Sequence, residues 1–424
     1  MVKFKLVENM MNNLRFVMVG HVDHGKSTLI GRLLYDTDSL PPDKMDEIRV
    51  ASEEQGKEVE FAYVMDHLEE ERSRSITIDT AQTFFKTPRR EYVIIDAPGH
   101  KEFLKNMITG ASQAEAAVLI VDAAEGLREQ TQRHAFMIDM LGLKQLVVVV
   151  NKMDSVEFSE ERFNQVKKDL IEFLSRVHLS PTFVIPISAK QGDNVSNRST
   201  KMDWYTGVTF LEALDSFVNL PSAQEKPFRF PVQLLHQVEG EEVVMGRVEA
   251  GILRRGEELV FLPGGERSRV KKILEFGSEG LSEAGAGVST GIVLDPPIQL
   301  ERGAVACRPG EEPPVTTKFP ASVFWMSPAS FHIEEEILFR VATEEVSARI
   351  VEIRERIDSS TLEVLEKNAK VLNDTEAGEV IIETARPVVV ESFYKTKELG
   401  RFVLVRGHDV VAGGIIAHAI SQRA

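Results

Sequence analysis

Short apolar runs alternate with longer stretches of helical spacing through the first half of the chain. Uninterrupted apolar runs indicate strands that are buried on both faces, and an alternation with helices predicts a mostly parallel, doubly wound sheet. A further short strand is expected at 83–85, after a long polar segment at 36–71 and a β-favouring stretch at 72–79. The apolar runs cover 16–19, 92–95, 117–122, 145–150 and 183–187, and the expected helices cover 27–34, 103–111, 130–141, 159–176 and 209–218.

Helical periodicity nearly disappears after a Pro-containing segment at 221–227. Short β-type runs then follow one another, separated by Gly, Pro and charged turns, and a second break lies at 308–314. This texture is typical of small β-barrels. The sequence therefore predicts an α/β fold with three domains: a nucleotide-binding domain (1–220) followed by two small β-barrels (221–312 and 313–424). The expected barrel strands are 230–235, 243–250, 258–262, 269–276, 288–294, 321–326, 337–341, 346–353, 379–383 and 401–406.

Composition narrows the class of protein. A chain of 424 residues is long enough for two or three domains, and its formal net charge of -16 argues against broad binding of nucleic-acid phosphates. A single cysteine, Cys307, excludes an internal disulfide framework and is expected to be a small buried residue. There is no apolar segment long enough to span a membrane and no signal-peptide pattern at the start, so a cytoplasmic location is expected.

The segment from Gly20 to Thr28 matches the phosphate-binding pattern G-x-x-x-x-G-K-[ST]. Its two glycines allow backbone N–H groups to curl around an anion, and the expected helix behind it places its N-terminus at the phosphates. Lys26 is expected to reach the β- and γ-phosphates, and Ser27 is expected to place its hydroxyl on Mg²⁺. An ordinary Gly-containing βα turn is the alternative.

Residues farther along the chain have the chemistry to complete a hydrolytic site. Asp96, at the end of a buried strand, is expected to hold Mg²⁺, and Gly99 to offer its N–H to the γ-phosphate. Thr77 is a candidate for the Mg²⁺ shell when triphosphate is bound, with a plain strand residue as the alternative. His100 is the candidate that orients the attacking water, with a helix-start residue as the alternative.

Asn151-Lys152-Met153-Asp154 predicts the identity of the base. A carboxylate accepts both the N1–H and the 2-amino N–H of guanine, whereas adenine offers neither. Asp154 is therefore expected to select guanine, and Ser188-Ala189-Lys190 to support the base, Ala189 through its backbone N–H. The predicted nucleotide contacts are Gly20, Asp23, His24, Gly25, Lys26, Ser27, Thr28, Gly99, Asn151, Lys152, Asp154, Ser188, Ala189 and Lys190; the predicted Mg²⁺ ligands are Ser27, Thr77 and Asp96; the predicted catalytic residues are Lys26, Thr77 and His100.

Taken together, these motifs resemble the translation-factor class of GTPases, and the likeness covers the whole chain, because that class follows its GTP-binding domain with two β-barrels. The resemblance implies binding of GTP or GDP with Mg²⁺, a slow intrinsic GTPase activity, and water positioning by His100. The class usually has glycine where this chain has Ser75, a departure that bears on the first switch and not on Mg²⁺ binding.

Two members of the class share further segments with this chain. The main interpretation is the GTPase large subunit of bacterial sulfate adenylyltransferase, which would drive formation of adenylyl sulfate beside a catalytic adenylyltransferase subunit. The alternatives are an elongation factor that delivers aminoacyl-tRNA to the ribosome, which His21 and His24 favour, and a switch GTPase that docks another partner. No second phosphate loop is present, which excludes a fused adenylyl-sulfate kinase. The segments that favour the sulfate-activating subunit are 134–136, 141–144, 323–326 and 400–404.

Overall fold

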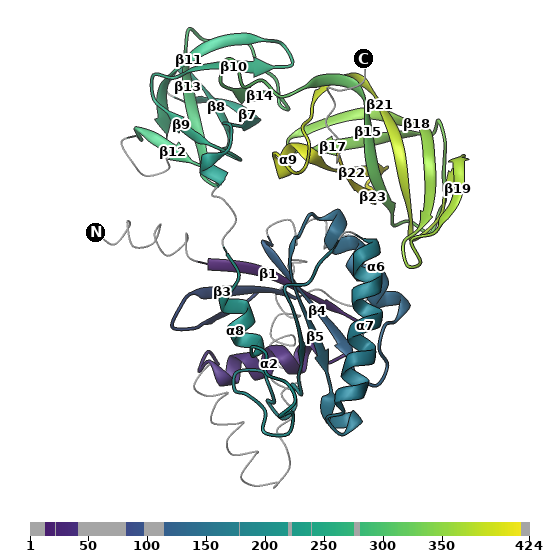
Figure 1. Ribbon diagram of the computed structural model, residues 1–424. Coiled ribbons are helices and arrows are strands. Elements are labelled where there is room, and N and C mark those ends of the chain that lie inside the picture. Colours follow the sequence, from purple (N-terminus) through teal and green to yellow (C-terminus); the bar gives the residue numbers. More distant parts are fainter. Residues whose placement is uncertain are drawn as a thin grey trace. The chain divides into compact units, whose positions relative to one another are not determined.

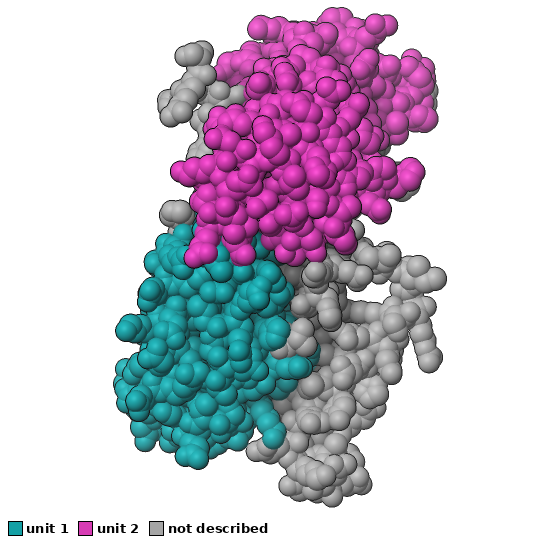
Figure 2. All heavy atoms as spheres, turned by 90° about the vertical axis from the view of Figure 1, so that its right-hand side faces the viewer, with its two compact units in different colours: residues 1–219, 359–362 teal, residues 220–358, 363–424 magenta. Residues whose placement is uncertain are grey.

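The computed structural model describes residues 13–21, 23–40, 82–96, 114–177, 179–218, 223–238, 240–274 and 280–416 (Figure 1). The chain divides into two compact units, residues 1–219 with 359–362 and residues 220–358 with 363–424 (Figure 2). Two expected elements, the strand within 72–79 and the helix at 103–111, lie outside the described residues. The predicted domain boundaries at 220/221 and 312/313 stay predictions.

The first unit contains a mixed sheet with the strand order β2-β3-β1-β4-β5-β6. All neighbours pair in parallel except β2, which runs antiparallel to β3 at the sheet edge. The predicted α/β sheet is thereby confirmed, and the short segment at 83–85 lies in its antiparallel edge strand. The strands are β1 (Asn13–Gly20), β2 (Gln82–Lys86), β3 (Glu91–Asp96), β4 (Ala116–Asp122), β5 (Gln145–Asn151) and β6 (Phe183–Pro186).

Helices cover both faces of this sheet (Figure 1). Alternate residues of β1, Leu14, Phe16 and Met18, are fully buried and pack in one cluster with residues of α2 and α8. Because successive side chains of a strand point to opposite faces, Val17 and Val19 point to the other face, where Figure 1 shows α6 and α7. The helices are α2 (Lys26–Asp36), α6 (Glu129–Met140), α7 (Glu160–Arg176) and α8 (Phe210–Asp215), with a 3₁₀ turn η2 (Met153–Val156) after β5.

Side-chain caps fix where two of these helices begin. Ser159 Oγ accepts a hydrogen bond from the N–H of Arg162 at 3.2 Å, and α7 follows directly. Thr209 and Glu212 form a capping box at the start of α8. Helix α8 ends at Asp215, earlier than the predicted 218, and Ser216 at its C-cap donates its hydroxyl to the carbonyl oxygen of Ala213 at 2.6 Å.

The second unit begins with a closed six-stranded barrel of order β10-β11-β13-β8-β7-β14. The β-type runs predicted this barrel correctly but missed its shorter strands, which contribute few alternating positions. Residues 223–225, within the expected linker, form a short 3₁₀ turn, η3 (Ala223–Glu225). The strands of this part are β7 (Phe230–Val238), β8 (Glu241–Arg247), β9 (Ile252–Arg254), β10 (Glu258–Leu262), β11 (Glu266–Leu274), β12 (Glu283–Gly285), β13 (Ser289–Asp295) and β14 (Val305–Cys307).

A second sheet of seven strands follows, in the order β17-β22-β23-β15-β21-β18-β19. Because β17 also pairs with β18, six of the strands close on themselves and β19 remains as an edge. This is the second predicted barrel. Its elements are β15 (Val315–Trp325), β16 (Phe331–His332), β17 (Glu336–Val341), β18 (Glu344–Asp358), β19 (Val364–Ala369), β20 (Val371–Leu372), β21 (Glu376–Val389), α9 (Lys397–Gly400), β22 (Arg401–Arg406) and β23 (Asp409–Ile415).

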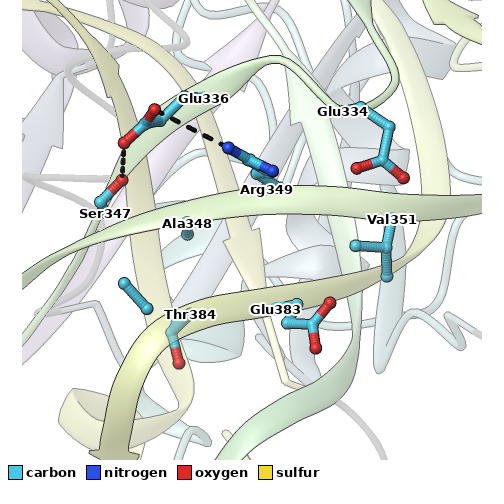
Figure 3. Close-up of a pocket in the computed structure, with 9 residues that line it drawn as sticks. Glu334, Glu336, Ser347, Ala348, Arg349, Val351, Glu383 and Thr384 are labelled. Atoms are coloured by element: carbon cyan, nitrogen blue, oxygen red, sulfur yellow. Dashed lines mark hydrogen bonds and ion pairs between the residues drawn. The ribbon is translucent and has the colours of Figure 1, made fainter.

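A shallow pocket of about 300 Å³ lies over β17, β18 and β21 (Figure 3). Glu336 accepts a hydrogen bond from Ser347 Oγ at 2.5 Å and pairs with Arg349 at 4.0 Å. Glu334 and Glu383 line the same pocket and are exposed to solvent. The pocket is an acidic surface feature whose charges are partly compensated, and it contains none of the predicted site residues.

Apolar contacts join the two barrels of the second unit. Val260, Leu262, Val305 and Cys307 of the first barrel form one buried cluster with Val389 and Leu399. Cys307 is fully buried, as predicted, and burial raises the pKa of its thiol to about 11.

Among the described residues, no helix combines the length and the apolar character needed to cross a membrane.

Candidate nucleotide-binding site

The phosphate loop connects β1 to α2, and both of its glycines are required by close contacts. A Cβ on Gly20 would lie 2.7 Å from the carbonyl oxygen of Ile120. Gly25 has φ 90°, a left-handed conformation, and a Cβ there would lie 2.4 Å from Asn151 Nδ2. Both glycines are therefore needed to seat the loop against its neighbours, and their contacts with phosphate stay predictions.

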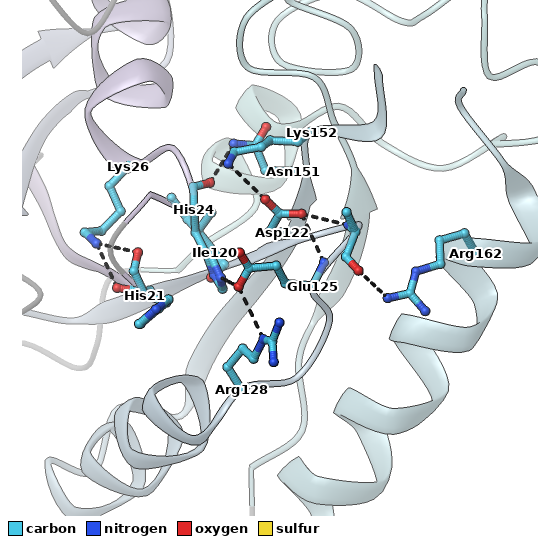
Figure 4. A network of polar contacts seen from close by, with 12 residues as sticks. His21, His24, Lys26, Ile120, Asp122, Glu125, Arg128, Asn151, Lys152 and Arg162 are labelled. Atoms are coloured by element: carbon cyan, nitrogen blue, oxygen red, sulfur yellow. Dashed lines mark hydrogen bonds and ion pairs between the residues drawn. The ribbon is translucent and has the colours of Figure 1, made fainter. Parts of the chain in front are cut away.

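Lys26, the first residue of α2, folds back over the loop. Its Nζ donates to the carbonyl oxygens of Gly20 at 2.7 Å and His21 at 3.0 Å (Figure 4). Ser27 and Thr28 follow in the first turn of the helix, where backbone N–H groups have no partner within the helix. The loop therefore presents a cation and a helix N-terminus in one place, which is the arrangement that binds phosphate groups.

The side chain of His24 contacts residues of β4 and of the turn after β4, beneath the phosphate loop. Its side chain is fully buried, with Nδ1 at 3.3 Å from the carbonyl oxygen of Ile120 and Nε2 at 3.4 Å from Glu125 Oε2 (Figure 4). Burial lowers the pKa of His24, more than its contacts with Ile120 and Glu125 raise it. His24 therefore supports the loop through buried contacts, and its predicted contact with the nucleotide stays a prediction. Asp23, predicted as a nucleotide contact, is exposed and has φ 64°.

Asn151 connects the phosphate loop to the segment predicted to bind the base. It is the last residue of β5 and is buried, and its Nδ2 donates to the carbonyl oxygen of His24 at 2.8 Å. Its Oδ1 accepts the N–H of Ala189 at 2.9 Å. The Asn151 side chain thus connects the end of β5 to two other loops, the phosphate loop and the loop containing Ala189.

Asp154, the carboxylate predicted to bind the base, accepts a hydrogen bond from the predicted segment Ser188-Ala189-Lys190. Ser188 Oγ donates to Asp154 Oδ1 at 2.6 Å, and the N–H of Gln191 donates to the same hydroxyl at 3.2 Å. Within the described part of the chain, Asp154 Oδ2 takes no hydrogen bond, so it is available to a ligand. The N–H of Ala189, predicted to contact the base, is used by Asn151 here, and its contact with a base stays a prediction. Lys190 is exposed.

Asp122 and Arg162, which lie outside the predicted motifs, also contact residues of this site. Asp122, the last residue of β4, pairs with Lys152 at 2.9 Å between Oδ2 and Nζ (Figure 4). Arg162 of α7 donates to the carbonyl oxygens of Ala123 and Ala124 at 2.7 and 2.9 Å. The available signal for Asp122 was a carboxylate at the carboxyl end of a buried parallel strand, where ligands bind.

The structure brings together Gly20, Gly25, Lys26, Asn151, Lys152 and Asp154 but does not describe all predicted residues. Thr77, Gly99 and His100 lie outside the described residues, and of Asp96 only the backbone is described, at the end of β3. Asp96 pairs in register with Met18, two residues before the phosphate loop, so the backbone position suits its predicted role. The roles of these residues stay predictions.

The described residues fit a guanine nucleotide. A glycine-lined loop with a cation can hold the phosphates, and a half-buried carboxylate with one free oxygen can accept guanine's N–H groups. A bound Mg²⁺ would neutralise charge on the β- and γ-phosphates, with Ser27 and Asp96 as its predicted ligands. This fold and site define the chain as a GTP-binding protein of the phosphate-loop class.

Comparisons with known proteins identify the family. Residues 11–220 match the elongation factor Tu GTP binding domain, and residues 318–417 match the GTP-eEF1A C-terminal domain-like family. Elongation factor 1-alpha of Pyrococcus furiosus is 40% identical over 96% of this chain and 97% of its own length. The same factor of Methanosphaerula palustris is 38% identical over 96% of this chain and 97% of its own length. The structure of sup35 complexed with GDP covers 97% of this chain and 95% of its own, at 26% identity and a TM-score of 0.45.

The chain therefore belongs to the elongation factor Tu and elongation factor 1-alpha family of translation-factor GTPases. Its cofactors are GTP or GDP with Mg²⁺. The predicted fold class and the predicted class of GTPase are confirmed. The narrower expectation of a sulfate-adenylyltransferase subunit gains no support from the relatives named here, which are elongation factors.

Proposed function

We propose that this chain, with GTP bound, carries aminoacyl-tRNA to the ribosome and hydrolyses GTP there. The observation that supports this most strongly is the extent of the likeness to elongation factor 1-alpha, which is 37–40% identical across 95–96% of the chain. It includes the barrels as well as the GTP-binding domain. In a GTPase of several domains, the parts outside the nucleotide site contain the surfaces that choose a partner.

The proposal assigns separate tasks to the residues of the site. Lys26 and the N-terminus of α2 hold the phosphates, while Asn151 and Asp154 bind guanine. We infer that Thr77 and Asp96 complete the Mg²⁺ shell and that His100 orients the attacking water. The corresponding test of His100 is His100→Ala, which should depress GTP hydrolysis in the stimulated complex and spare GDP affinity. An unchanged stimulated rate would remove His100 from this role.

Protection of the aminoacyl ester provides a direct test of the proposed partner. The purified chain would be mixed with aminoacyl-tRNA in the presence of a non-hydrolysable GTP analogue or of GDP, and the rate of spontaneous deacylation measured. Slower deacylation with the GTP analogue than with GDP is the expected result. If deacylation is equally fast with the GTP analogue and with GDP, when the protein is in excess over aminoacyl-tRNA and fully loaded with nucleotide, the proposal is overturned.

The alternative partners are distinguished by a pull-down of the GTP-loaded chain from its native extract, with protein and RNA both identified. Aminoacyl-tRNA or ribosomes in the bound fraction would support the elongation-factor function. A small adenylyltransferase subunit in that fraction would instead support the sulfate-activating function. Measurement of coupled ATP and GTP turnover with sulfate would then follow.

The net charge of -16 leads to a specific expectation for RNA binding. A strongly acidic chain can contact phosphates only through local basic patches, so few counterions are released when tRNA binds. The affinity for aminoacyl-tRNA should therefore fall only shallowly as salt is raised. A steep dependence, equivalent to roughly ten released counterions, would show that the charge argument is wrong for this surface.

A further inference from the structure

Lys152 forms an ion pair with Asp122, a residue outside the nucleotide-binding motifs. Lys152 has φ 61°, a left-handed conformation that is strained for a residue with a Cβ, and its ammonium lies 2.9 Å from Asp122 Oδ2. Its side chain is 39% exposed, whereas that of Asp122 is 6% exposed. Both ends of the lysine are thus held while part of its carbon chain faces solvent.

Asp122 is itself fixed from several directions (Figure 4). Its Oδ1 accepts the N–H groups of Ala124 at 2.7 Å and Glu125 at 3.2 Å, so the carboxylate forms the turn that follows β4. Arg162 holds the carbonyl oxygens of this turn from α7. Burial acts to raise the pKa of Asp122, but hydrogen bonds from Lys152 and from the N–H of Ala124 outweigh it, and the pKa is lowered. The ion pair with Lys152 is therefore present at neutral pH.

We propose that Asp122 is a positioning residue for the guanine base: it fixes the Lys152 side chain before the nucleotide arrives. Lys152 lies two residues before Asp154, the predicted base-reading carboxylate. The carbon chain of a lysine is apolar surface against which a planar base can pack. A free lysine would lose rotamer freedom when the base binds, and the ion pair removes that loss in advance. The proposal concerns nucleotide binding and holds whichever partner the chain has.

The decisive experiment separates the ion pair from the turn. Asp122→Asn retains an oxygen for the N–H groups of Ala124 and Glu125 but removes the charge that holds Lys152. It should raise the Kd for GDP and the KM for GTP by about threefold to tenfold, the range expected for freeing one long side chain. The kcat for GTP hydrolysis should stay within about twofold of wild type, because the base is bound equally before and during the reaction.

A double-mutant cycle with Lys152→Met shows whether Asp122 acts through the lysine. In the Lys152→Met background, Asp122→Asn should cause little further loss of GDP affinity. An equal fold-loss in both backgrounds would overturn the proposal, because Asp122 would then act through the turn alone. Asp139→Asn is the matched control, since Asp139 pairs with Lys144 at 2.7 Å outside the site; its GDP affinity should equal that of wild type.

A second variant keeps the test decisive if Asp122→Asn does not fold. Lys152→Arg retains a cation for Asp122, whereas Lys152→Met does not. Lys152→Arg should retain most of the GDP affinity that Lys152→Met loses, with both measured by displacement of a fluorescent GDP analogue. Equal losses in the two variants would contradict the proposed role of the ion pair.

Discussion

The guanidinium of Arg229 forms a bidentate ion pair with the carboxylate of Glu391 in the second unit, and both side chains are buried. Nε and Nη2 of Arg229 lie 3.1 and 3.0 Å from the two carboxylate oxygens, and the exposed fractions are 0% and 2%. Lys395 and Thr396 also donate to Glu391. Arg229 precedes the first barrel and Glu391 follows β21 of the second, so the pair joins the two barrels in one compact unit.

Removing one partner of this pair should destabilise the second unit strongly. Glu391→Gln leaves the Arg229 charge buried without a counter-charge, and the expected loss in the free energy of unfolding is about 3–5 kcal/mol. A double variant, Arg229→Met with Glu391→Leu, should lose much less, because it buries no unpaired charge. Urea unfolding would be followed by the fluorescence of Trp325 in a Trp204→Phe background, since the chain has 2 tryptophans.

The exposed pair between Arg340 and Glu345 provides the control. Their side chains are 43% and 48% exposed, and an exposed pair contributes at most about 1 kcal/mol. Glu345→Gln should therefore change the stability of the same unit only slightly. A similar loss in Glu391→Gln and Glu345→Gln would contradict the assignment of the buried pair as the stronger link.

Replacement of Gly25 by alanine should abolish tight nucleotide binding. The new Cβ would lie 2.4 Å from Asn151 Nδ2, and the alanine backbone would have to adopt φ 90°. Strain of about 1–2 kcal/mol and loss of the Asn151 hydrogen bond, about 1–3 kcal/mol, together predict a loss of GDP affinity of about 30-fold to several thousandfold. Displacement of a fluorescent GDP analogue measures it.

Gly256→Ala is a matched control for backbone strain. Gly256 has φ 83° and no atom within 4 Å of its expected Cβ. Its alanine variant carries the same left-handed strain without a clash and lies in the first barrel. GDP affinity should be unchanged there, and equal losses in the two variants would show that the contact with Asn151 is not the cause.

The sequence predicted the strands that are buried on both faces, because an uninterrupted apolar run such as 145–150 has few alternative structures. The motif spacing also predicted Gly20, Gly25 and Asp154, which the structure places against Ile120, Asn151 and Ser188, whereas the contacts of these residues with a nucleotide stay predictions. Short strands such as β9 (Ile252–Arg254) were missed because three residues cannot show a period of two. The ion pair of Asp122 and Lys152 was missed because it depends on the parallel register of β4 and β5, which pairs Asp122 with Asn151.

Asp154→Asn should exchange the base specificity from guanine to xanthine. Asparagine presents an amide that can donate to the carbonyl that xanthine has in place of guanine's 2-amino group. The neutral amide removes the charge from the acceptor and turns an N–H donor toward guanine's 2-amino group, which predicts a fall in GTP affinity of about 10²–10⁴-fold. Binding of XTP should rise in the same variant, and competition of both nucleotides against a fluorescent GDP analogue measures the exchange.

Ser188→Ala tests whether a change in the orientation of Asp154 is enough to alter GTP affinity and base specificity. It removes the hydroxyl that donates to Asp154 Oδ1 at 2.6 Å and leaves the carboxylate in place. GTP affinity should fall by about tenfold, as expected for one hydrogen bond to a charged group, with no gain of XTP binding. If Asp154→Asn fails to bind XTP while remaining folded, Asp154 is not the residue that reads the base.

The carboxyl group of Glu249 should make the stability of the second unit depend on pH. Burial raises the pKa of Glu249 to about 6, and the nearby Glu398 adds to this, whereas Arg247 and Arg401 oppose it. The folded state therefore binds a proton more tightly than the unfolded state, whose carboxyl has a pKa of 4.5. Stability from this group is fully present below pH 4.5 and is lost as the pH rises through about 6, with a total of about 2 kcal/mol.

Glu249→Gln removes this titration and is the variant that checks it. At pH 8 the variant should be more stable than wild type by up to about 2 kcal/mol, and at pH 4 the two should be equal, because the wild-type carboxyl is then protonated. Urea midpoints of Trp325 fluorescence at both pH values measure the difference. Glu334→Gln, which changes an exposed carboxyl of the same unit, should give only small differences at either pH. A Glu249→Gln variant that is less stable than wild type at pH 8 would show that the ionised carboxylate is stabilised by Arg247 and Arg401 more than burial penalises it.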